Sequence, residues 1–591
     1  MILDKESVKG FKWEILENKK VNKKDIPTDV KIPNKIIELL LSRGISSIQD
    51  YFSPSFKSLM PDPHYFKDME NAINNITDVI LKGEKIAVFG DYDVDGATSS
   101  SIVARYMREI GIEHTIHIPH RIHEGYGPNI DALLKLKKEG YKTVIIVDSG
   151  SLAHEVLEKA HKNKINIIVL DHHMCEKPDL PKGIIVNPNR FDEDKKYHYL
   201  CAAGLSFLFL VGLNRKLREI SFFKDKNINE PNIKEYLGIV ALGTVCDVMK
   251  LVDLNRAYVA MGLPYLEKNL GINALVNVIN KYKEEKANEE GKNFYALKPP
   301  FSAMDCGFNI GPCINAGGRI GDEANMGARL LYTDDEEEAN EIAEKLVALN
   351  EERKIQEKIA VETSSEVVKE KYLNSNIIVV YDKKWHPGVI GIVASRLKDK
   401  FNKTTVVIGE GGKGSCRSVD GYNIGEAIIE SVENKICKVG GGHAAAAGLT
   451  VDPKNVNKLR KFLDEKTKDF TSPPIKMDIN FSIEELTPDL ITSFEKMEPT
   501  GTGNHKPRIV IHHVKCVSSS VMKGLHYKLR LEDDNGFVME AIAFNVADTP
   551  LGDAMATCED KYVSITGDLY INSYGGKNRV EMKVSDMIVE D

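Results

Sequence analysis

Short, unbroken apolar segments alternate with amphipathic segments between residues 85 and 188, and this pattern constrains the fold more than any other feature of the chain. The apolar segments are KIAVFG (85–90), TIHIP (115–119), TVIIVD (143–148), INIIVLD (165–171) and IIVNP (184–188). The amphipathic segments between them span 97–110, 130–138 and 152–161. Strands that are apolar along their whole length are typical of parallel sheets covered by helices on both faces. We therefore predict an α/β domain whose ligands bind beyond the carboxyl ends of its strands.

The middle of the chain predicts mostly helix and then a second α/β unit. Helical segments dominate from residue 203 to about 281, and the charged stretch KYKEEKANEEGKNFY (281–295) predicts a surface loop. A long helix is predicted from Thr333, with Thr333 and Glu336 at capping-box spacing, to around Lys371. The segments NIIVVYD (376–382) and TTVVIGE (404–410) flank a predicted helix at 389–401 and indicate two further strands.

After Pro473-Pro474 the pattern favours short alternating strands. Two hairpins are predicted, one around DDNG (533–536) and one around SYGG (573–576). In HYKLRLE (526–532), His526, Lys528 and Arg530 share one face, and Tyr527, Leu529 and Leu531 share the other. A basic face on a small barrel suits an OB-type domain that binds single strands, and the alternative is an ordinary solvated strand face.

Three aspartates directly follow the first strand, in GDYDVDGATSS (90–100). Alternate residues of an extended segment point the same way, so Asp91, Asp93 and Asp95 are expected to converge at the carboxyl edge of the sheet. Unpaired carboxylates repel one another, and a divalent cation is their natural partner. The alternative is an exposed acidic turn that caps the next helix.

Further acidic and imidazole groups follow later strands. Asp148 ends the third strand, Asp171 with His172 and His173 ends the fourth, and Asp247 follows a helical stretch. Carboxylate and imidazole together suit manganese, magnesium or iron rather than structural zinc. There are enough ligands for two ions, with Asp148 as a candidate bridge, and two ions are the usual clamp for attack on phosphorus.

Two glycine-rich stretches, GKGSCRS (412–418) and GGGHAAAAG (440–448), predict loops whose backbone N–H groups cradle phosphate, assisted by Arg417 and His443. The alternative is two structural turns. The formal net charge of −8 does not favour nucleic acid by itself, so contact with it would come from local basic patches or bound metal. The nine cysteines lack a C-x-x-C pair and are interpreted as buried, reduced thiols. No apolar run predicts a membrane span or a signal peptide.

Taken in order, these motifs resemble the DHH phosphoesterase superfamily and, more narrowly, its RecJ family of single-stranded-DNA-specific exonucleases. The motifs that carry the resemblance are VFGDYDVDG (88–96), EGYGPN (124–129), IIVDSG (145–150), DHH (171–173), NPN (187–189), ALGTVCDV (241–248), INAGGRIGD (314–322), WHPGVIGIVASR (385–396), GKGSCRS and GGGHAAAAG.

The resemblance implies two α/β domains, of the DHH and DHHA1 types, joined by a long helix and followed by an OB-type β-barrel. The expected parts are an N-terminal segment (1–83), a DHH catalytic domain (84–325), a connecting helix (326–373), a DHHA1 domain (374–472) and the OB domain (473–591).

The resemblance also implies roles for particular residues. It places a two-ion Mn²⁺ or Mg²⁺ site on Asp91, Asp93, Asp95, Asp148, His172 and Asp247. It assigns catalysis to Asp148, Asp171, His172 and His173, with His173 on the scissile phosphate. It assigns binding of the 5′ end to Arg121, Arg319, Ser415 and Arg417. The glycine-rich stretch and the basic strand face described above add the candidate substrate-binding residues Gly441, Gly442, His443, Lys528 and Arg530.

The expected function is metal-dependent 5′-to-3′ degradation of single-stranded DNA to 5′-mononucleotides. The expected partners are a DNA strand with a 5′ end, a helicase and a single-strand-binding protein, and a cytoplasmic monomer outside any membrane is expected. One alternative is a phosphodiesterase for short oligonucleotides or cyclic dinucleotides, which the residues after Pro473 disfavour. The other is a non-catalytic single-strand-binding scaffold, which the full set of metal-site residues disfavours.

Overall fold

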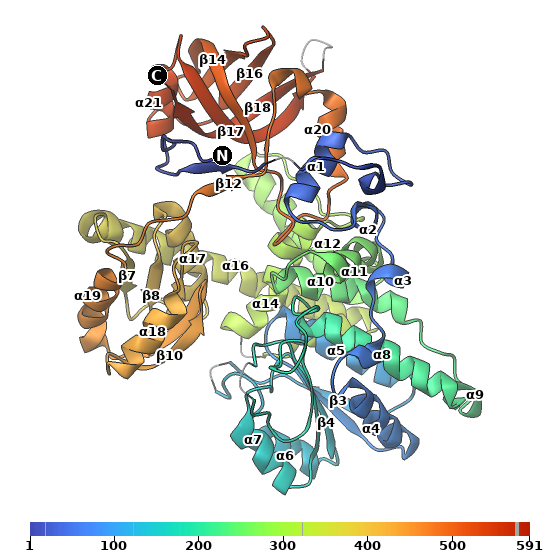
Figure 1. The fold of residues 1–591 in the computed structure, drawn as a ribbon. Helices are drawn as coiled ribbons and strands as arrows, with labels where there is room; N and C mark the ends of the chain where they lie inside the picture. Colours follow the sequence, from blue (N-terminus) through green and yellow to red (C-terminus); the bar gives the residue numbers. More distant parts are fainter. Residues whose placement is uncertain (18, 122, 176–177, 322, 574–577, 591) are drawn as a thin grey trace. The chain divides into compact units, whose positions relative to one another are not determined.

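The computed structural model describes residues 1–591 except 18, 122, 176–177, 322, 574–577 and 591 (Figure 1). The chain forms two compact units. One comprises residues 54–355 and 499–505, and the other comprises 1–53, 356–498 and 506–591. No described helix is long and apolar enough to cross a membrane.

The first unit is built on a five-stranded sheet in the order β3-β2-β4-β5-β6. Its strands are β2 (Ile86–Phe89), β3 (His114–His117), β4 (Thr143–Val147), β5 (Asn166–Leu170) and β6 (Ile184–Val186). Every neighbouring pair is parallel, so the predicted α/β sheet is confirmed. The carboxyl ends of all five strands therefore meet at one edge.

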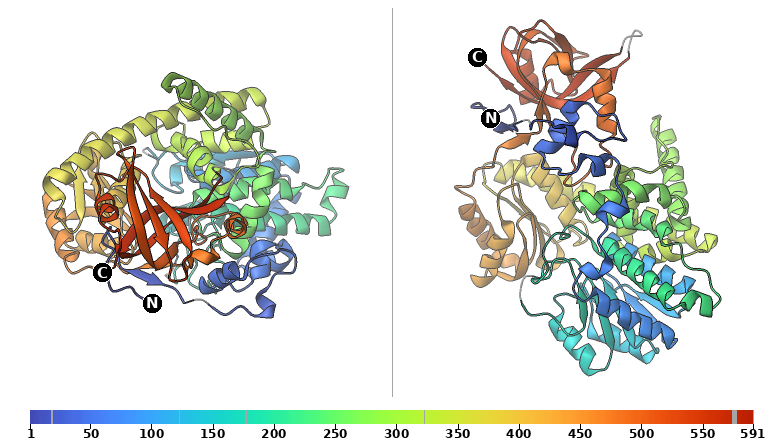
Figure 2. Two further views of the ribbon diagram at one scale, coloured as in Figure 1. Left: turned by 90° about the horizontal axis from the view of Figure 1, so that it is seen from above. Right: turned by 45° about the vertical axis from the view of Figure 1, so that its right-hand side comes forward.

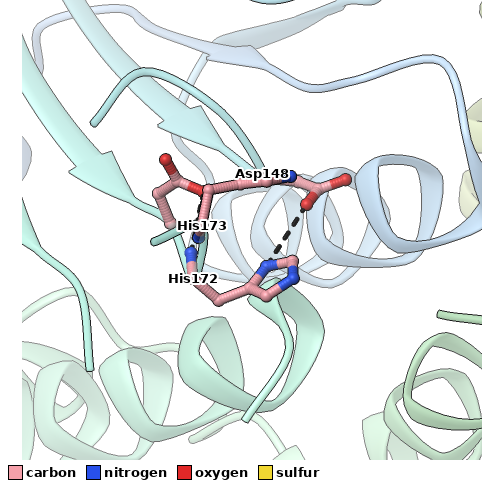
Figure 3. A group of neighbouring side chains, drawn as sticks. Asp148, His172 and His173 are labelled. Carbon is pink, nitrogen blue, oxygen red and sulfur yellow. Dashed lines mark hydrogen bonds and ion pairs between the residues drawn. The ribbon is translucent and has the colours of Figure 1, made fainter. Parts of the chain in front are cut away.

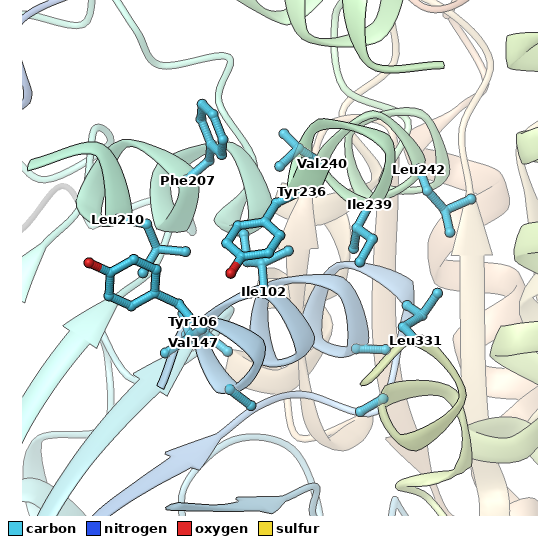
Figure 4. Close-up of a cluster of buried hydrophobic side chains, with 14 of the residues drawn as sticks. Ile102, Tyr106, Val147, Phe207, Leu210, Tyr236, Ile239, Val240, Leu242 and Leu331 are labelled. Carbon is cyan, nitrogen blue, oxygen red and sulfur yellow. The ribbon is translucent and has the colours of Figure 1, made fainter. Parts of the chain in front are cut away.

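Helices cover both faces of this sheet because its strands are apolar on both sides. Ile145 and Val147 of β4 belong to a core with α4 (Met69–Leu81), α5 (Val94–Glu109) and α8 (Ala202–Glu219). The alternate residues Val144 and Ile146 pack with α6 (Ile130–Lys138) and α7 (His154–Lys162). Figure 4 shows Ile102 and Tyr106 of α5 near Val147, Phe207 and Leu210 in the larger core.

Further helices complete this unit, and one of them corrects a prediction. They are α3 (Phe56–Leu59), α9 (Phe222–Asp225), α10 (Leu237–Cys246), α11 (Asp253–Leu266), α12 (Leu270–Glu290), α13 (Ala303–Asp305), α14 (Gly311–Ile320) and α15 (Met326–Tyr332). The surface loop predicted for 281–295 is wrong over its first ten residues, because α12 runs to Glu290. Lys, Glu and Ala are strong helix formers, and Gly291 ends the helix in a left-handed conformation with φ 63°.

The predicted long helix is present as α16 (Glu336–Val367), followed by a π-helical turn at Val368–Tyr372. The predicted capping pair is shifted, because the backbone N–H of Glu338 donates to Asp335 Oδ1 at 3.0 Å. Thr333 instead donates its hydroxyl to the Glu338 carboxylate at 2.6 Å.

The second unit contains another five-stranded sheet, in the order β10-β11-β9-β8-β7. Its strands are β7 (Ile378–Tyr381), β8 (Thr405–Ile408), β9 (Lys413–Arg417), β10 (Cys437–His443) and β11 (Ala446–Val451), and its helices are α17 (Ile390–Phe401), α18 (Ile424–Glu433) and α19 (Val456–Lys466). The two glycine-rich stretches predicted as loops are strands, since β9, β10 and β11 form antiparallel ladders. Much of their backbone therefore pairs with neighbouring strands.

The C-terminal strands form a closed five-stranded barrel, red in Figures 1 and 2. The strands β14 (Ile509–Met522), β15 (His526–Glu532), β16 (Val538–Ala543), β18 (Arg579–Val589) and β17 (Tyr562–Asn572) pair in that order, and β17 closes on β14. The hairpin predicted at DDNG is confirmed by antiparallel β15 and β16. Antiparallel β17 and β18 form the second hairpin, although part of its SYGG turn lies outside the described residues.

The N-terminal segment packs with the barrel, which the sequence did not predict. Strand β1 (Trp13–Ile15) pairs in parallel with β12 (Ile475–Met477). Side chains of α1 (Asn34–Ser42) and α2 (Ile48–Phe52) share the barrel's apolar core, together with α20 (Pro488–Glu495) and α21 (Pro550–Ala556).

Candidate metal centre

The three aspartates after β2 do not lie on one extended segment, so that part of the prediction is wrong. Helix α5 begins at Val94, and Asp93 caps it by accepting the Gly96 N–H at 3.1 Å. Asp95 therefore lies in the first helical turn. Gly96 is required there, because a Cβ would lie 2.3 Å from the Asp91 carbonyl oxygen.

The acidic and imidazole groups gather in overlapping sets at the carboxyl edge of the sheet. Asp91, Asp93 and Asp148 form one set, and Asp95, His172 and Asp247 form another, with potential ligand atoms within 4.8 Å of one another in each. Asp148 also belongs to a set with Asp171, His172 and His173. The geometry thus offers two adjacent cation positions with Asp148 beside both.

His172 lies between carboxylates from three separate elements. Its Nδ1 is 3.5 Å from Asp148 Oδ1, after β4, and 3.7 Å from Asp95 Oδ2, in α5. Its Nε2 is 3.2 Å from Asp247 Oδ2, at the end of α10. Figure 3 shows the His172 ring facing the Asp148 carboxylate.

The electrostatics of this pocket favour a cation. Burial raises the pKa of Asp91 to about 8 and that of Asp95 to about 7, and neighbouring carboxylates add to both shifts. Burial opposes charge on His172, but the hydrogen bond and charge of Asp247 outweigh it and raise its pKa to about 9. The pocket thus retains protons at neutral pH that divalent cations would replace.

Two buried polar atoms at the site lack a hydrogen-bond partner among the described residues. They are Asp91 Oδ1 and His172 Nδ1, one from each neighbourhood of ligand atoms. Buried polar atoms are almost always satisfied in folded proteins, so unpaired atoms of this kind indicate a missing ligand. Carboxylate oxygens with an imidazole nitrogen fit manganese or magnesium, and the donor set therefore fits two such ions.

Asp171 has a different role from the other carboxylates. Its Oδ1 accepts hydrogen bonds from the backbone N–H groups of His172 and His173, and it lies 2.7 Å from the ring nitrogen Nδ1 of His173. Its Oδ2 accepts a hydrogen bond from the backbone N–H of Ser151. Burial works to raise its pKa, but the hydrogen bond to His173 outweighs burial and holds the pKa well below the ordinary value. We interpret Asp171 as the residue that positions His173.

We expect Asp171→Asn to lower kcat by about 10–100-fold, the usual cost of losing a group that orients a ligand or a reacting side chain. Hydrogen bonding to Asp171 outweighs burial and raises the pKa of His173. The substitution removes the charge of Asp171 and so lowers the pKa of His173. Activity that depends on protonated His173 should therefore begin to fall at a lower pH in the variant than in the parent. A pH–rate profile with unchanged shape would contradict the positioning role.

Two asparagines and a tyrosine contact the two histidines at this edge of the sheet, and the sequence patterns predicted no role for them. Asn187 Nδ2 donates to the His173 carbonyl at 2.9 Å, and Asn189 Nδ2 donates to the His172 carbonyl at 2.6 Å. The Tyr126 hydroxyl lies 3.0 Å from His173 Nε2. The only available signal was their position in NPN after β6 and in EGYGPN.

The predicted substrate-binding arginines of this unit lie beside the acidic cluster. The Arg121 guanidinium lies 4.9 Å from the centre of the Tyr92 ring. Tyr92 stands between Asp91 and Asp93 in the sequence. Arg319 lies in the last turn of α14. The preceding Gly318 lets that helix approach Tyr92, since a Cβ there would lie 2.3 Å from the Tyr92 carbonyl oxygen. Both cations are therefore near the first set of carboxylates.

In the other unit, the register gathers the predicted phosphate-binding residues on one face of the sheet, here called the β9 face. Gly441, Gly448 and Ser415 lie on one rung, and His443, Ala446 and Arg417 lie two residues along. A Cβ built on Gly448, opposite Ser415, would meet only the Gly414 carbonyl oxygen, at 4.0 Å, and one built on Gly441 would meet nothing within 4 Å, so the backbone along this rung is open. Gly442 belongs to the same strand with its Cα on the alternate rung.

Arg417 on the β9 face is suited to an anion. Its Nη1 donates to Ser415 Oγ at 3.1 Å and to the Cys416 carbonyl, and it has no ion pair with a described residue. Burial lowers its pKa, so a phosphate would be a favourable partner. The first turn of α17 adjoins it, since a Cβ on Gly391 would lie 3.2 Å from both Ser415 Oγ and Arg417 Nη2.

The strand face predicted to be basic in the barrel also carries carboxylates. Lys528 Nζ pairs with Glu540 Oε2 at 2.7 Å, and the register places Arg530 opposite Glu540 and Glu540 opposite Glu581. The alternation of β15 is as predicted, with Leu529 and Leu531 buried. A substrate-binding role for Lys528 and Arg530 stays a prediction.

Comparisons with known proteins agree with this geometry. Residues 85–244 match the DHH family N-terminal domain, residues 374–469 match the DHHA1 domain, and residues 477–586 match the RecJ OB domain. The DHH match covers the sheet with the acidic cluster, the DHHA1 match covers the sheet with the β9 face, and the RecJ OB match covers the barrel. The chain belongs to the RecJ family of DHH proteins. The fold class inferred from the sequence is thereby confirmed.

Relatives of this RecJ-family chain align along nearly all of it. The single-stranded-DNA-specific exonuclease RecJ of Bacillus subtilis is 29% identical over 598 residues, covering 98% of this chain and 71% of that protein. The protein of the same name from Escherichia coli is 28% identical, covering 95% of this chain and 97% of that protein.

Solved structures resemble this RecJ-family chain as well. The crystal structure of Thermus thermophilus RecJ in complex with Mn²⁺ has a TM-score of 0.75 and 25% identity, covering 95% of this chain and 76% of that one. A crystal structure of exonuclease RecJ bound to manganese has a TM-score of 0.56 and 29% identity, covering 69% of this chain and 96% of that one.

Proposed function

We propose that the protein is a metal-dependent exonuclease that degrades single-stranded DNA from the 5′ end to 5′-mononucleotides. The observation that carries the proposal is the pair of ligand sets sharing the neighbourhood of Asp148, in a chain whose relatives are single-stranded-DNA-specific exonucleases. Repair, recombination and replication are the processes that such an activity serves. The helicase, the single-strand-binding protein and the cytoplasmic location stay predictions from the resemblance.

The first ligand set, Asp91, Asp93 and Asp148, would hold one divalent ion, and the second, Asp95, His172 and Asp247, would hold the other. When bound, Mn²⁺ or Mg²⁺ supplies charge neutralisation at the phosphate and an acidified water as nucleophile.

The chain's own residues orient the strand. Asp171 holds His173 through Nδ1, which leaves the other ring nitrogen for the phosphate or for Tyr126. Arg121 and Arg319, beside the acidic cluster, are suited to backbone phosphates on that side. Arg417 and Ser415 of the β9 face are suited to the terminal 5′ phosphate, which would fix the bond to be cut.

The function is tested by digesting end-labelled DNA. A 5′-phosphorylated single strand should release 5′-mononucleotides with Mn²⁺ or Mg²⁺ and none with chelator, and a blunt duplex should resist. Faster cleavage of a dinucleotide or a cyclic dinucleotide than of a long strand would instead support the short-substrate phosphodiesterase. Tight binding of the strand without cleavage, in the presence of Mn²⁺, would support the scaffold.

Arg417→Ala should separate recognition of the end from chemistry. We expect kcat/KM on 5′-phosphorylated strands to fall by about 10–100-fold, because a charge-assisted contact to phosphate contributes about 1.5–3 kcal/mol. Strands with a 5′ hydroxyl should be affected less. Arg396→Ala is the matched control, since Arg396 is an exposed arginine of α17 that pairs with Glu357. Equal losses on both kinds of strand would contradict a role at the 5′ phosphate.

A further inference from the structure

A hollow of about 490 Å³ lies at the amino-terminal edge of the first sheet, between the end of α7 and the starts of β5 and β6. Ile165, Ile167 and Ile184 are among its lining residues. Asn75 of α4 and Asn166 of β5 add amide groups to the wall, with Asn166 Nδ2 donating to Asn75 Oδ1 at 2.6 Å. Of the elements around it, α4 and α7 are labelled in Figure 1.

The charged and titratable side chains that line this hollow are all potential cations. They are His161, Lys164 and Lys182, and no carboxylate lines the hollow. None of the three forms an ion pair with a described residue. The carboxyl end of a helix carries partial negative charge, which stabilises the cations of His161 and Lys164 near the end of α7. That effect does not account for Lys182, which comes from the segment before β6 and reaches the same hollow.

The composition of the wall favours a ligand with an anionic group and an apolar, hydrogen-bonding part. Ligand sites typically have volumes of about 300–1,000 Å³ and combine apolar walls with a few convergent polar groups. Two lysines suit a phosphate, the half-buried Ile184 suits the face of a base, and the amides suit its edge. A nucleoside 5′-monophosphate has all three parts and fits the volume.

The hollow is separate from the metal centre. Apart from Asn75 of α4, its residues lie before or at the starts of strands β5 and β6, whereas Asp148, Asp171 and His172 follow strands of the same sheet. A strand of five residues spans about 17 Å, so the two sites are on opposite edges of one sheet. A ligand in the hollow would leave the catalytic edge open.

We propose that this hollow is a second binding site for nucleoside 5′-monophosphates, with the phosphate between Lys164 and Lys182 and the base against Ile184. The choice of this ligand rests on the proposed function, because mononucleotides are the product that the reaction releases. The site itself rests on the hollow and its cations, which do not depend on that function.

The test is photolabelling of the full-length protein with 8-azido-2′-deoxyadenosine 5′-monophosphate in chelator, followed by peptide mapping. We expect label on peptides from 161–184 in addition to any label at the catalytic edge. Lys182→Glu should reduce labelling of these peptides at least tenfold. Lys164→Asn should also reduce it, and Asn tolerates the left-handed backbone at that position, where φ is 55°. Lys138→Glu, which reverses an exposed lysine on α6, is the matched control and should leave the label unchanged.

Competitors define the ligand class in the same experiment. Unlabelled dAMP should displace the label from 161–184, whereas deoxyadenosine and inorganic phosphate at equal concentration should compete at least tenfold less well. Absence of label there, or label insensitive to Lys182→Glu, would overturn the site. Equal competition by phosphate alone, or by an oligonucleotide, would overturn the mononucleotide assignment. Because no turnover occurs in chelator, failure of the exonuclease proposal would leave this result readable.

Discussion

Asp148→Asn should abolish nuclease activity while leaving the protein folded. Asp148 adjoins both ligand sets, so its loss affects both cation positions, and kcat should fall by about 10³-fold or more. Asn is the appropriate replacement because the residue has a left-handed backbone, with φ 59°, which Asn tolerates and Ala does not. Release of mononucleotides from a labelled single strand in Mn²⁺ measures the effect.

The same variant should be at least as stable as the parent in chelator. Burial and the charges of Asp93 and Asp95 raise the pKa of Asp148 well above its ordinary value, which means that its ionised form is disfavoured in the metal-free fold. Removing the charge relieves that repulsion, so the melting temperature should rise or stay constant. Asp78→Ala, on the exposed face of α4, is the control. Retained activity, or a melting temperature that falls with the activity, would contradict the assignment.

The sequence predicted the position of the site because parallel sheets impose it. Once residues 143–148 and 165–171 were read as parallel strands, Asp148 and His172 had to meet at one edge. Asp247 could not be placed this way, since it follows a helix, and its contact with His172 depends on how α10 packs. The same is true of Tyr126, which reaches His173 from a loop.

Local reasoning failed where tertiary pairing decides the outcome. The backbone of GKGSCRS and GGGHAAAAG carries many glycines, which predicts loops, yet ladders with β11 and β8 make these stretches strands. The alternation of HYKLRLE showed its own basic face but not Glu540, which the register of β16 brings opposite Arg530. A single strand carries no information about the charges of its neighbours.

The corrected pairing makes the phosphate-binding hypothesis more specific. Loops would have offered backbone N–H groups, but those of paired strands are largely engaged in the ladder. The β9 face instead offers the side chains of Ser415 and Arg417 beside bare glycine backbone, with the first turn of α17 adjacent. The recognition of an anion there therefore depends on side chains, and mutation can test it directly.

Chelation should destabilise the protein progressively as the pH rises. In the metal-free fold the pKa of Asp91 is raised from 3.8 to about 8, that of Asp95 to about 7 and that of His172 from 6.5 to about 9. These pKa values set a window from about pH 4 to pH 8 in which the folded state binds more protons than the unfolded state. The free energy of unfolding of the metal-free protein therefore falls as the pH rises through this window. Mn²⁺ replaces those protons and binds more tightly at higher pH.

We therefore expect the gap in melting temperature between Mn²⁺ and chelator to be small at low pH and to widen toward pH 8. With Mn²⁺ at roughly a hundred times its dissociation constant for each of the two positions, the gap should reach about 5–10 °C. Calorimetry across this pH range measures it, and Asp148→Asn, which lacks a shared ligand, should show a much smaller gap. A gap that stays constant or narrows as the pH rises would contradict the replacement of protons by Mn²⁺, and no gap at any pH would contradict the two-cation pocket.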